Sequence, residues 1–265
     1  MKTTIAITLT ALASLPLPAL AQSAFTGTWK TDVSTFQAPK APDIFSLKDN
    51  SYTCATCAPA YTVPADGAPH AVTGHPYYDA VAIKVVDDHT IKESDSKAGK
   101  PVIESTTTIS ADNKILNFEF TDSSNTNAAP VSGKGTATRV GKAGPKGAHA
   151  VTGSWRVSTF NNMSDNGLTQ TFKGAGGTLS MSTPTGQSYE AKLDGTDSPY
   201  KGDPGTTSVS VKAKGKTMIV ETDKRDGKVI GIATMTVSKD GKTLSVSYAD
   251  KLRGRTSTYK ATKQD

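Results

Sequence analysis

The feature that most constrains the fold is an internal duplication of the chain. The sequence Phe-Thr-Gly-Thr-Trp-Lys at residues 25–30 recurs as Val-Thr-Gly-Ser-Trp-Arg at residues 151–156. Further matches follow in the same order, among them Tyr61 with Tyr189 and a Ser-x-Asp-x-Lys turn in each half. Matches at a nearly constant separation indicate two copies of one structural unit.

Residues 1–21 read as a secretory signal peptide. Lys2 supplies the positive start, an apolar stretch follows, and the tripeptide Ala-Leu-Ala ending at Ala21 has the small-x-small cleavage pattern. Pro16 and Pro18 interrupt the apolar stretch, which is also too short for a membrane helix. We therefore expect cleavage after Ala21 and a periplasmic or secreted protein without a membrane span.

Composition and turn spacing predict an all-β fold. The chain is rich in Thr, Ser and Val, holds 23 Gly and 14 Pro, and has no convincing helical stretch. Short strand-like runs alternate with turn signals such as the Asp-Gly pair at Asp240. We predict two tandem antiparallel up-and-down β-barrels of about eight or nine strands each. They would span residues 22–143 and 144–265, on either side of a Gly-rich linker, with one larger fused sheet as the alternative.

The Gly-x-Trp motif at the start of each copy, followed by a chain of hairpins, resembles the lipocalin-like (calycin) barrels. The Gly-Thr-Trp-Lys opening and the repeated Asp-Gly-Lys turns are similar to a poorly characterised group of bacterial secreted lipocalin-like proteins. The resemblance implies that Trp29 and Trp155 each close one end of a barrel beside a basic residue of the last strand. Arg139 is the candidate for that residue in the first copy, whereas Tyr259 and Lys260 occupy the matching stretch in the second.

The two cysteines are separated by two residues and are followed by two histidines at zinc-finger spacing. They are Cys54 and Cys57, with His70 and His75. Residues 58–76 hold several Pro and Gly and cannot form the helix that a zinc finger needs. We therefore predict no metal site and no cofactor, and a local disulfide across a hairpin tip. A redox-active pair is the alternative.

A cluster of titratable residues occurs only in the first copy. His75, Tyr77 and Asp79 are the candidates for general acid–base chemistry, whereas the position of His75 is Asp203 in the second copy. The competing interpretation is a set of solvated turn residues. No catalytic serine motif is present, and the Gly-rich segment 174–177 lies between strand-like runs and reads as a turn.

These observations favour a non-enzymatic protein that binds a small ligand or a partner. The alternatives are a hydrolase or isomerase with its site near His75 at the mouth of the first barrel, and a structural envelope scaffold. The formal net charge is +6, and the excess of basic residues lies in the second copy, which favours an anionic ligand unless these residues simply form a solvated surface. A small apolar ligand is the other candidate. No run of basic and aromatic residues predicts a nucleic-acid partner. The sequence does not specify the ligand or the oligomeric state.

Overall fold

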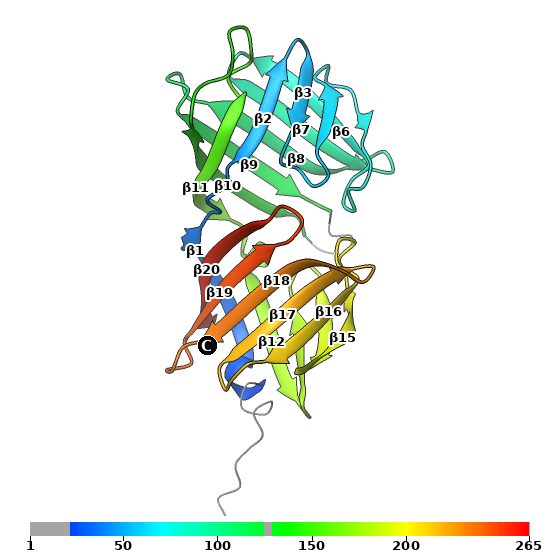
Figure 1. Ribbon diagram of the computed structural model, residues 1–265, viewed down its shortest axis with the longest axis vertical. Helices are drawn as coiled ribbons and strands as arrows, with labels where there is room; N and C mark the ends of the chain where they lie inside the picture. Colours follow the sequence, from blue (N-terminus) through cyan, green and yellow to red (C-terminus); the bar gives the residue numbers. More distant parts are fainter. Residues whose placement is uncertain (1–21, 125–128, 265) are drawn as a thin grey trace, which may run out of the picture.

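The computed structural model describes residues 22–124 and 129–264, and the expected signal peptide lies outside these residues. The molecule consists of two β-barrels stacked along its long axis (Figure 1). Apart from a helical turn at residues 22–25 and the short 3-10 helix η1 (Asp165–Gly167), its regular structure is β-strand. The predicted all-β class is confirmed. No helix in the described part of the chain is long and apolar enough to cross a membrane.

The first barrel is a sheet in the order β4-β3-β2-β11-β10-β9-β8-β7-β6-β5. Its open edge is nearly closed by an isolated bridge between Asp66 and Lys84. Its strands are β2 (Asp43–Lys48), β3 (Ser51–Cys54), β4 (Tyr61–Pro64), β5 (His70–Ala71), β6 (Ala80–Asp87), β7 (Thr90–Lys97), β8 (Lys100–Ile109), β9 (Ile115–Asp122), β10 (Val131–Val140) and β11 (Gly153–Met163).

The second barrel is closed, in the order β1-β12-β13-β14-β15-β16-β17-β18-β19-β20. Each barrel therefore has ten strands, and the predicted eight or nine was too low. Short strands such as β5 were missed because they lie in segments whose Pro and Gly residues read as turns. The strands of this barrel are β1 (Gly27–Gln37), β12 (Thr169–Ala175), β13 (Thr178–Ser182), β14 (Ser188–Lys192), β15 (Asp194–Lys201), β16 (Ser208–Ala213), β17 (Met218–Arg225), β18 (Lys228–Val237), β19 (Thr243–Asp250) and β20 (Arg255–Gln264).

The two copies exchange their first strands. Strand β1 pairs with β12 and β20 in the second barrel, whereas β11 pairs with β2 and β10 in the first. The predicted units 22–143 and 144–265 therefore correspond to the sequence repeats, while each barrel takes one strand from the other repeat. Either strand can occupy the same position in a barrel, because β1 and β11 carry the same Gly-x-Trp pattern. The rings of Phe36 and Phe160 meet edge to face at 5.1 Å where the exchanged strands lie side by side.

Each barrel is closed by a buried tryptophan. Trp29 has no exposed surface in the second barrel, and Trp155 is 1% exposed in the first. Arg139 lies over the ring of Trp155, at 4.0 Å from the centroid, whereas the resemblance placed it beside Trp29. Over Trp29 the basic group is Lys263, at 5.4 Å. The strand exchange explains why each tryptophan meets the last strand of the other repeat. On β20 the register places Lys263 opposite Trp29, three residues beyond the Tyr259–Lys260 stretch that the sequence matched to Arg139.

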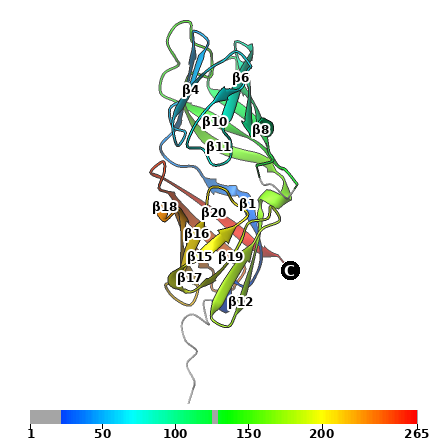
Figure 2. The ribbon, with the colours of Figure 1, turned by 90° about the vertical axis from the view of Figure 1, so that its right-hand side faces the viewer.

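Turns of the two barrels meet at the middle of the molecule (Figure 2). Arg255 at the start of β20 donates to the Asp43 carboxylate and to the Pro42 carbonyl, both at 2.6 Å. Arg253 donates to the carbonyl of Thr56, which lies inside the Cys54–Cys57 loop. The disulfide itself is confirmed. It shapes a loop of the first barrel that contacts the second.

Candidate functional site

A pair of acidic residues occupies equivalent positions in the two barrels. Glu93 and Asp95 lie on β7, and Glu221 and Asp223 lie on β17. Residues two apart on a strand face the same side of a sheet. Each acidic pair therefore lies on the same side of its strand as a buried isoleucine, Ile91 or Ile219. Both pairs therefore point into the barrels, where carboxyl groups are rare.

A buried tyrosine donates a hydrogen bond to the glutamate of each pair. Tyr61 donates its hydroxyl hydrogen to Glu93 Oε1 at 2.8 Å, and Tyr189 donates to Glu221 Oε2 in the second barrel. Burial raises the pKa of both tyrosines, so their hydroxyl groups stay protonated and can donate to the carboxyl groups. The duplication has preserved this arrangement in both copies.

Burial also raises the pKa of carboxyl groups in both pairs. It raises the pKa of Glu221 to about 8, with a further contribution from Asp223. It raises the pKa of Asp223 to about 6, with Asp203 adding repulsion. In the first barrel, burial and then Glu93 raise the pKa of Asp95 to about 8. At neutral pH the pair on β17 therefore holds about one proton and one negative charge.

The pair on β17 faces a cavity of about 400 Å³ between the two barrels, which we call the inter-barrel cavity. Neither Glu93 nor Asp95 is among the residues that line it. The first barrel contributes Ala58, His75, Pro76, Tyr77 and Tyr78, and the second contributes charged and aromatic side chains that include Tyr200, Asp203, Glu221, Asp223, Arg225, Tyr248 and Arg253.

Two polar atoms at the inter-barrel cavity lack hydrogen-bond partners among the described residues. They are His75 Nε2 and Asp223 Oδ1. His75 is only 9% exposed and is held between the rings of Tyr61 and Tyr78, at 5.6 and 4.6 Å. Burial, and then the charge of Arg253, lower the pKa of His75, which favours the neutral imidazole. A buried polar group without a partner costs about 1–3 kcal/mol. Asp95 Oδ1 in the first barrel also lacks a partner among the described residues, but only His75 Nε2 and Asp223 Oδ1 lie at this cavity, where a ligand could satisfy both.

The structure brings together two of the three predicted acid–base residues. His75 and Tyr77 both line the inter-barrel cavity. The carboxylate of Asp79 instead accepts the backbone N–H of Ala98, at 3.0 and 3.2 Å, in the turn after β7. Tyr77 donates to Asp203 at 2.9 Å across the interface. Asp203 matches His75 in the repeat, so equivalent segments of the two copies meet at this cavity.

Sequence reasoning missed the paired carboxyl groups. The pattern Ile-x-Glu-x-Asp occurs at Ile91 and again at Ile219, at the same separation as the match between Tyr61 and Tyr189. It therefore belonged to the duplication that the sequence analysis detected. Polar neighbours on both sides, such as Lys92 and Ser94, made the first pair resemble a solvated strand.

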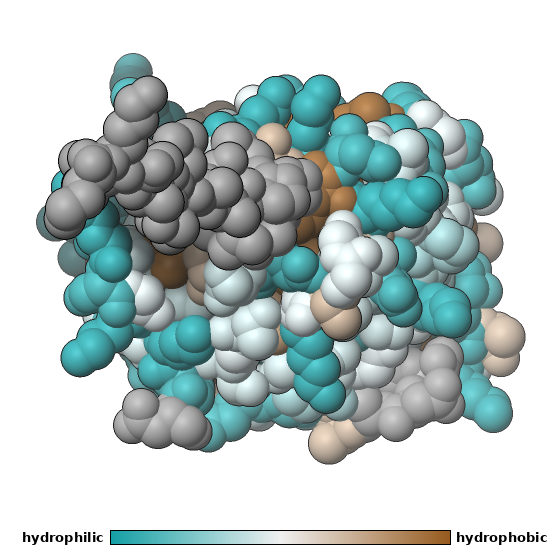
Figure 3. All heavy atoms as spheres, turned by 90° about the horizontal axis from the view of Figure 1, so that it is seen from below, coloured by the Kyte–Doolittle hydropathy of each residue, from teal (hydrophilic) through white to brown (hydrophobic). Residues whose placement is uncertain are grey.

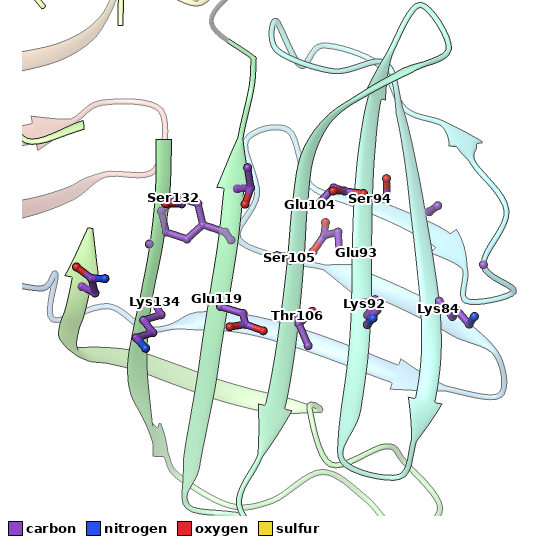
Figure 4. Close-up of a pocket in the computed structure, with 16 residues that line it drawn as sticks. Lys84, Lys92, Glu93, Ser94, Glu104, Ser105, Thr106, Glu119, Ser132 and Lys134 are labelled. Carbon is purple, nitrogen blue, oxygen red and sulfur yellow. The ribbon is translucent and has the colours of Figure 1, made fainter. Parts of the chain in front are cut away.

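A larger depression of about 590 Å³ lies on the first barrel. Figure 4 shows labelled residues from neighbouring strands in rows, one of which runs through Lys92, Thr106, Glu119 and Lys134. These three charged side chains are exposed and of both signs. Exposed charges are screened by water and select a ligand weakly, so we do not place the site here.

Among the described residues, the far end of the second barrel is filled by aromatic side chains. Phe25, Trp29 and Phe172 fill it, and none of the three has exposed surface. Seen from that end, the visible surface is mostly hydrophilic with small hydrophobic patches (Figure 3). Of the two ends of this barrel, the one at the inter-barrel cavity is therefore the candidate entrance for a ligand.

No model of a known protein family matches the chain, and no curated protein is detectably similar to it. The all-β fold with two barrels is compatible with a calycin-like barrel.

Proposed function

We propose that this protein binds a small molecule in the inter-barrel cavity without transforming it. The observation that carries the proposal is the pair of unpartnered atoms, His75 Nε2 and Asp223 Oδ1, in a cavity of about 400 Å³. A volume of this size is typical of small-molecule sites, which combine aromatic walls with a few convergent polar groups. Tyr77, Tyr78 and Tyr248 supply the aromatic walls here.

The acid–base alternative receives less support. It would use His75 with a carboxylate that orients or assists the imidazole, and Asp79 was the candidate for that carboxylate. Asp79 instead binds a backbone amide in a turn. The ring of His75 contacts Tyr61 and Tyr78, and its Nε2 has no hydrogen-bond partner among the described residues. His75 therefore lacks the carboxylate partner that usually assists a histidine in proton transfer.

A thermal-shift screen with the complete chain tests the proposal. A ligand at 100 times its dissociation constant stabilises a protein by about 2.7 kcal/mol. Leu252 lines the cavity and is 41% exposed, so Leu252→Trp fills the rim without disturbing a core. Val229→Trp is the matched control, since Val229 is 37% exposed and is not among the lining residues.

We expect a shift that persists in Val229→Trp and is lost in Leu252→Trp. A shift that survives in Leu252→Trp would place binding elsewhere. The absence of a shift with amines, alcohols, sugars, carboxylic acids and lipids alike would contradict the proposal.

We also propose that the protein is an exported lipocalin-like protein, as residues 1–21 and the Gly-x-Trp motifs suggest. A disulfide between Cys54 and Cys57 suits an oxidising compartment. Mass spectrometry of the chain from the producing cell tests this, and we expect a mature protein that begins at Gln22. A mature chain that retains residues 1–21 would contradict export by this signal.

A further inference from the structure

We propose that the ligand of the inter-barrel cavity is a small organic cation, whose protonated nitrogen binds the carboxyl pair of Glu221 and Asp223. This inference rests on the binding function proposed above and adds the chemical class of the ligand.

The charges that line the cavity are unbalanced. Its walls carry the carboxyl groups of Asp203, Glu221, Asp223 and Asp250 but only the two guanidinium groups of Arg225 and Arg253. Most of these groups have partners. Asp203 Oδ1 accepts from Tyr77 and from two backbone amides, and Asp250 forms an ion pair with Arg253.

Glu221 and Asp223 have hydrogen-bond partners but no positively charged partner among the described residues. Among the described residues, neither Glu221 nor Asp223 takes part in an ion pair. Lys224 follows Asp223 in sequence but binds Asp197 instead. The Asp223 carboxyl group shares a hydrogen bond with Glu221, but its Oδ1 is left as a free acceptor, and a cation beside it would stabilise the buried negative charge.

The lining favours an organic cation over a metal ion. In the described part of the chain, no group of three or more His, Cys, Asp or Glu side chains is arranged to hold a metal. The rings of Tyr77, Tyr78, Tyr200 and Tyr248 line the same cavity. Aromatic faces attract organic cations, and an ammonium group brings three donors for carboxylate oxygens.

His75 supplies a second contact, from the first barrel, to the same cavity. It belongs to the first barrel, it is nine-tenths buried, and its Nε2 has no hydrogen-bond partner among the described residues. A neutral imidazole can accept a hydrogen bond from a ligand or donate one to it. The cavity is therefore suited to a small amine with a short body that spans from Asp223 to His75.

Three probes of nearly equal shape and different charge test the inference by calorimetry on the complete chain. They are benzylamine, benzyl alcohol and benzoate. We expect benzylamine to bind at least about tenfold more tightly than the other two, which corresponds to about 1.4 kcal/mol. Asp223→Asn should weaken benzylamine binding by a similar factor, whereas Glu221→Gln, which replaces a mostly protonated acid, should weaken it less. The duplicated pair offers matched controls, since Asp95→Asn and Glu93→Gln alter equivalent residues away from the cavity and should leave the affinity unchanged.

The outcomes separate the two proposals. Two results would overturn the proposal of a cationic ligand: equal affinity for the three probes, or a preference for benzoate or benzyl alcohol. If that binding is lost in Leu252→Trp, the proposed binding function still stands. Benzylamine binding that is lost in Asp95→Asn but kept in Asp223→Asn would overturn the assigned site. Failure of all three probes would count against both proposals. Thermal denaturation of each variant shows whether a loss of binding reflects unfolding.

Discussion

Arg139, from the first repeat, lies over the indole of Trp155, from the second repeat, with its guanidinium carbon 4.0 Å from the ring centroid. The same guanidinium donates to the carbonyl oxygens of Asn113, Ala150 and Thr152, at 2.6, 2.7 and 2.7 Å. One side chain thus holds the end of β10, the entry to β11 and a neighbouring turn.

Replacing Arg139 should destabilise the protein. Arg139→Ala removes three charge-assisted hydrogen bonds and the contact with Trp155, so we expect a loss of about 2–3 kcal/mol in the free energy of unfolding. Urea denaturation measures it. Lys263→Ala is the control in the second barrel, because Lys263 is exposed and lies farther from its tryptophan, at 5.4 Å. It should cost less than about 1 kcal/mol. Equal losses would contradict the assigned role of Arg139.

The strand exchange predicts which cysteine pairs can form. Lys30 on β1 is opposite Thr262 on β20. The repeat partner of Lys30 is Arg156, which is opposite Thr138 on β10. Facing residues on paired strands are close enough for a disulfide. The double variant Lys30→Cys with Thr262→Cys should therefore form a cross-link on oxidation, detected by peptide mass spectrometry.

The control pair is Lys30→Cys with Thr138→Cys. It would form a cross-link only if each repeat kept its own first strand. Formation of this second cross-link, and not the first, would show that the strands are not exchanged.

The contribution of Glu221 to stability should decrease as the pH rises. The pKa of Glu221 is raised from 4.5 to about 8 by burial and by Asp223. Below pH 4.5 the group is protonated in both the folded and the unfolded chain, and its contribution is complete. Between that pH and about 8, the unfolded chain ionises more readily, so the free energy of unfolding falls.

Glu221→Gln should remove part of this decrease, because a neutral amide takes the place of the protonated acid. We expect the variant to match the wild type at pH 4 and to exceed it by at least about 1 kcal/mol at pH 8, measured by urea denaturation. Glu190→Gln is the control, since Glu190 is exposed on β14. A variant that is less stable than the wild type at pH 8 would contradict the burial of a protonated carboxyl group.

The disulfide should contribute modestly to the free energy of unfolding. Cys54 and Cys57 close a very short loop, so Cys54→Ser with Cys57→Ser should cost up to about 2 kcal/mol. Chemical reduction of the wild type should reproduce the loss. Complete unfolding of the double variant or of the reduced protein at room temperature would contradict this estimate. It would show that the loop around Thr56, which contacts Arg253, stabilises the protein by more than the loop-closure entropy of the disulfide.

The sequence was sufficient to predict the duplication, the all-β class and the disulfide, because each leaves a local pattern. It could not show the strand exchange, since β1 and β11 share one motif and either fits either barrel. The buried acids were missed for a different reason. Glu93 and Asp95 are surrounded by polar residues, and only the closure of the barrel around them reveals that they point inward. His75 and Tyr77 were found, but their position between two barrels depends on packing that no local pattern encodes.

The pairing of β1 with β20 has a consequence for how the chain is made. The first strand to emerge during synthesis must wait for the last before the second barrel can close, and the first barrel waits for β11 from the other repeat. Contacts between such distant parts of a chain form slowly. The first barrel can therefore close once β11 has emerged, about three fifths of the way along the chain, whereas the second barrel stays open until synthesis is almost complete.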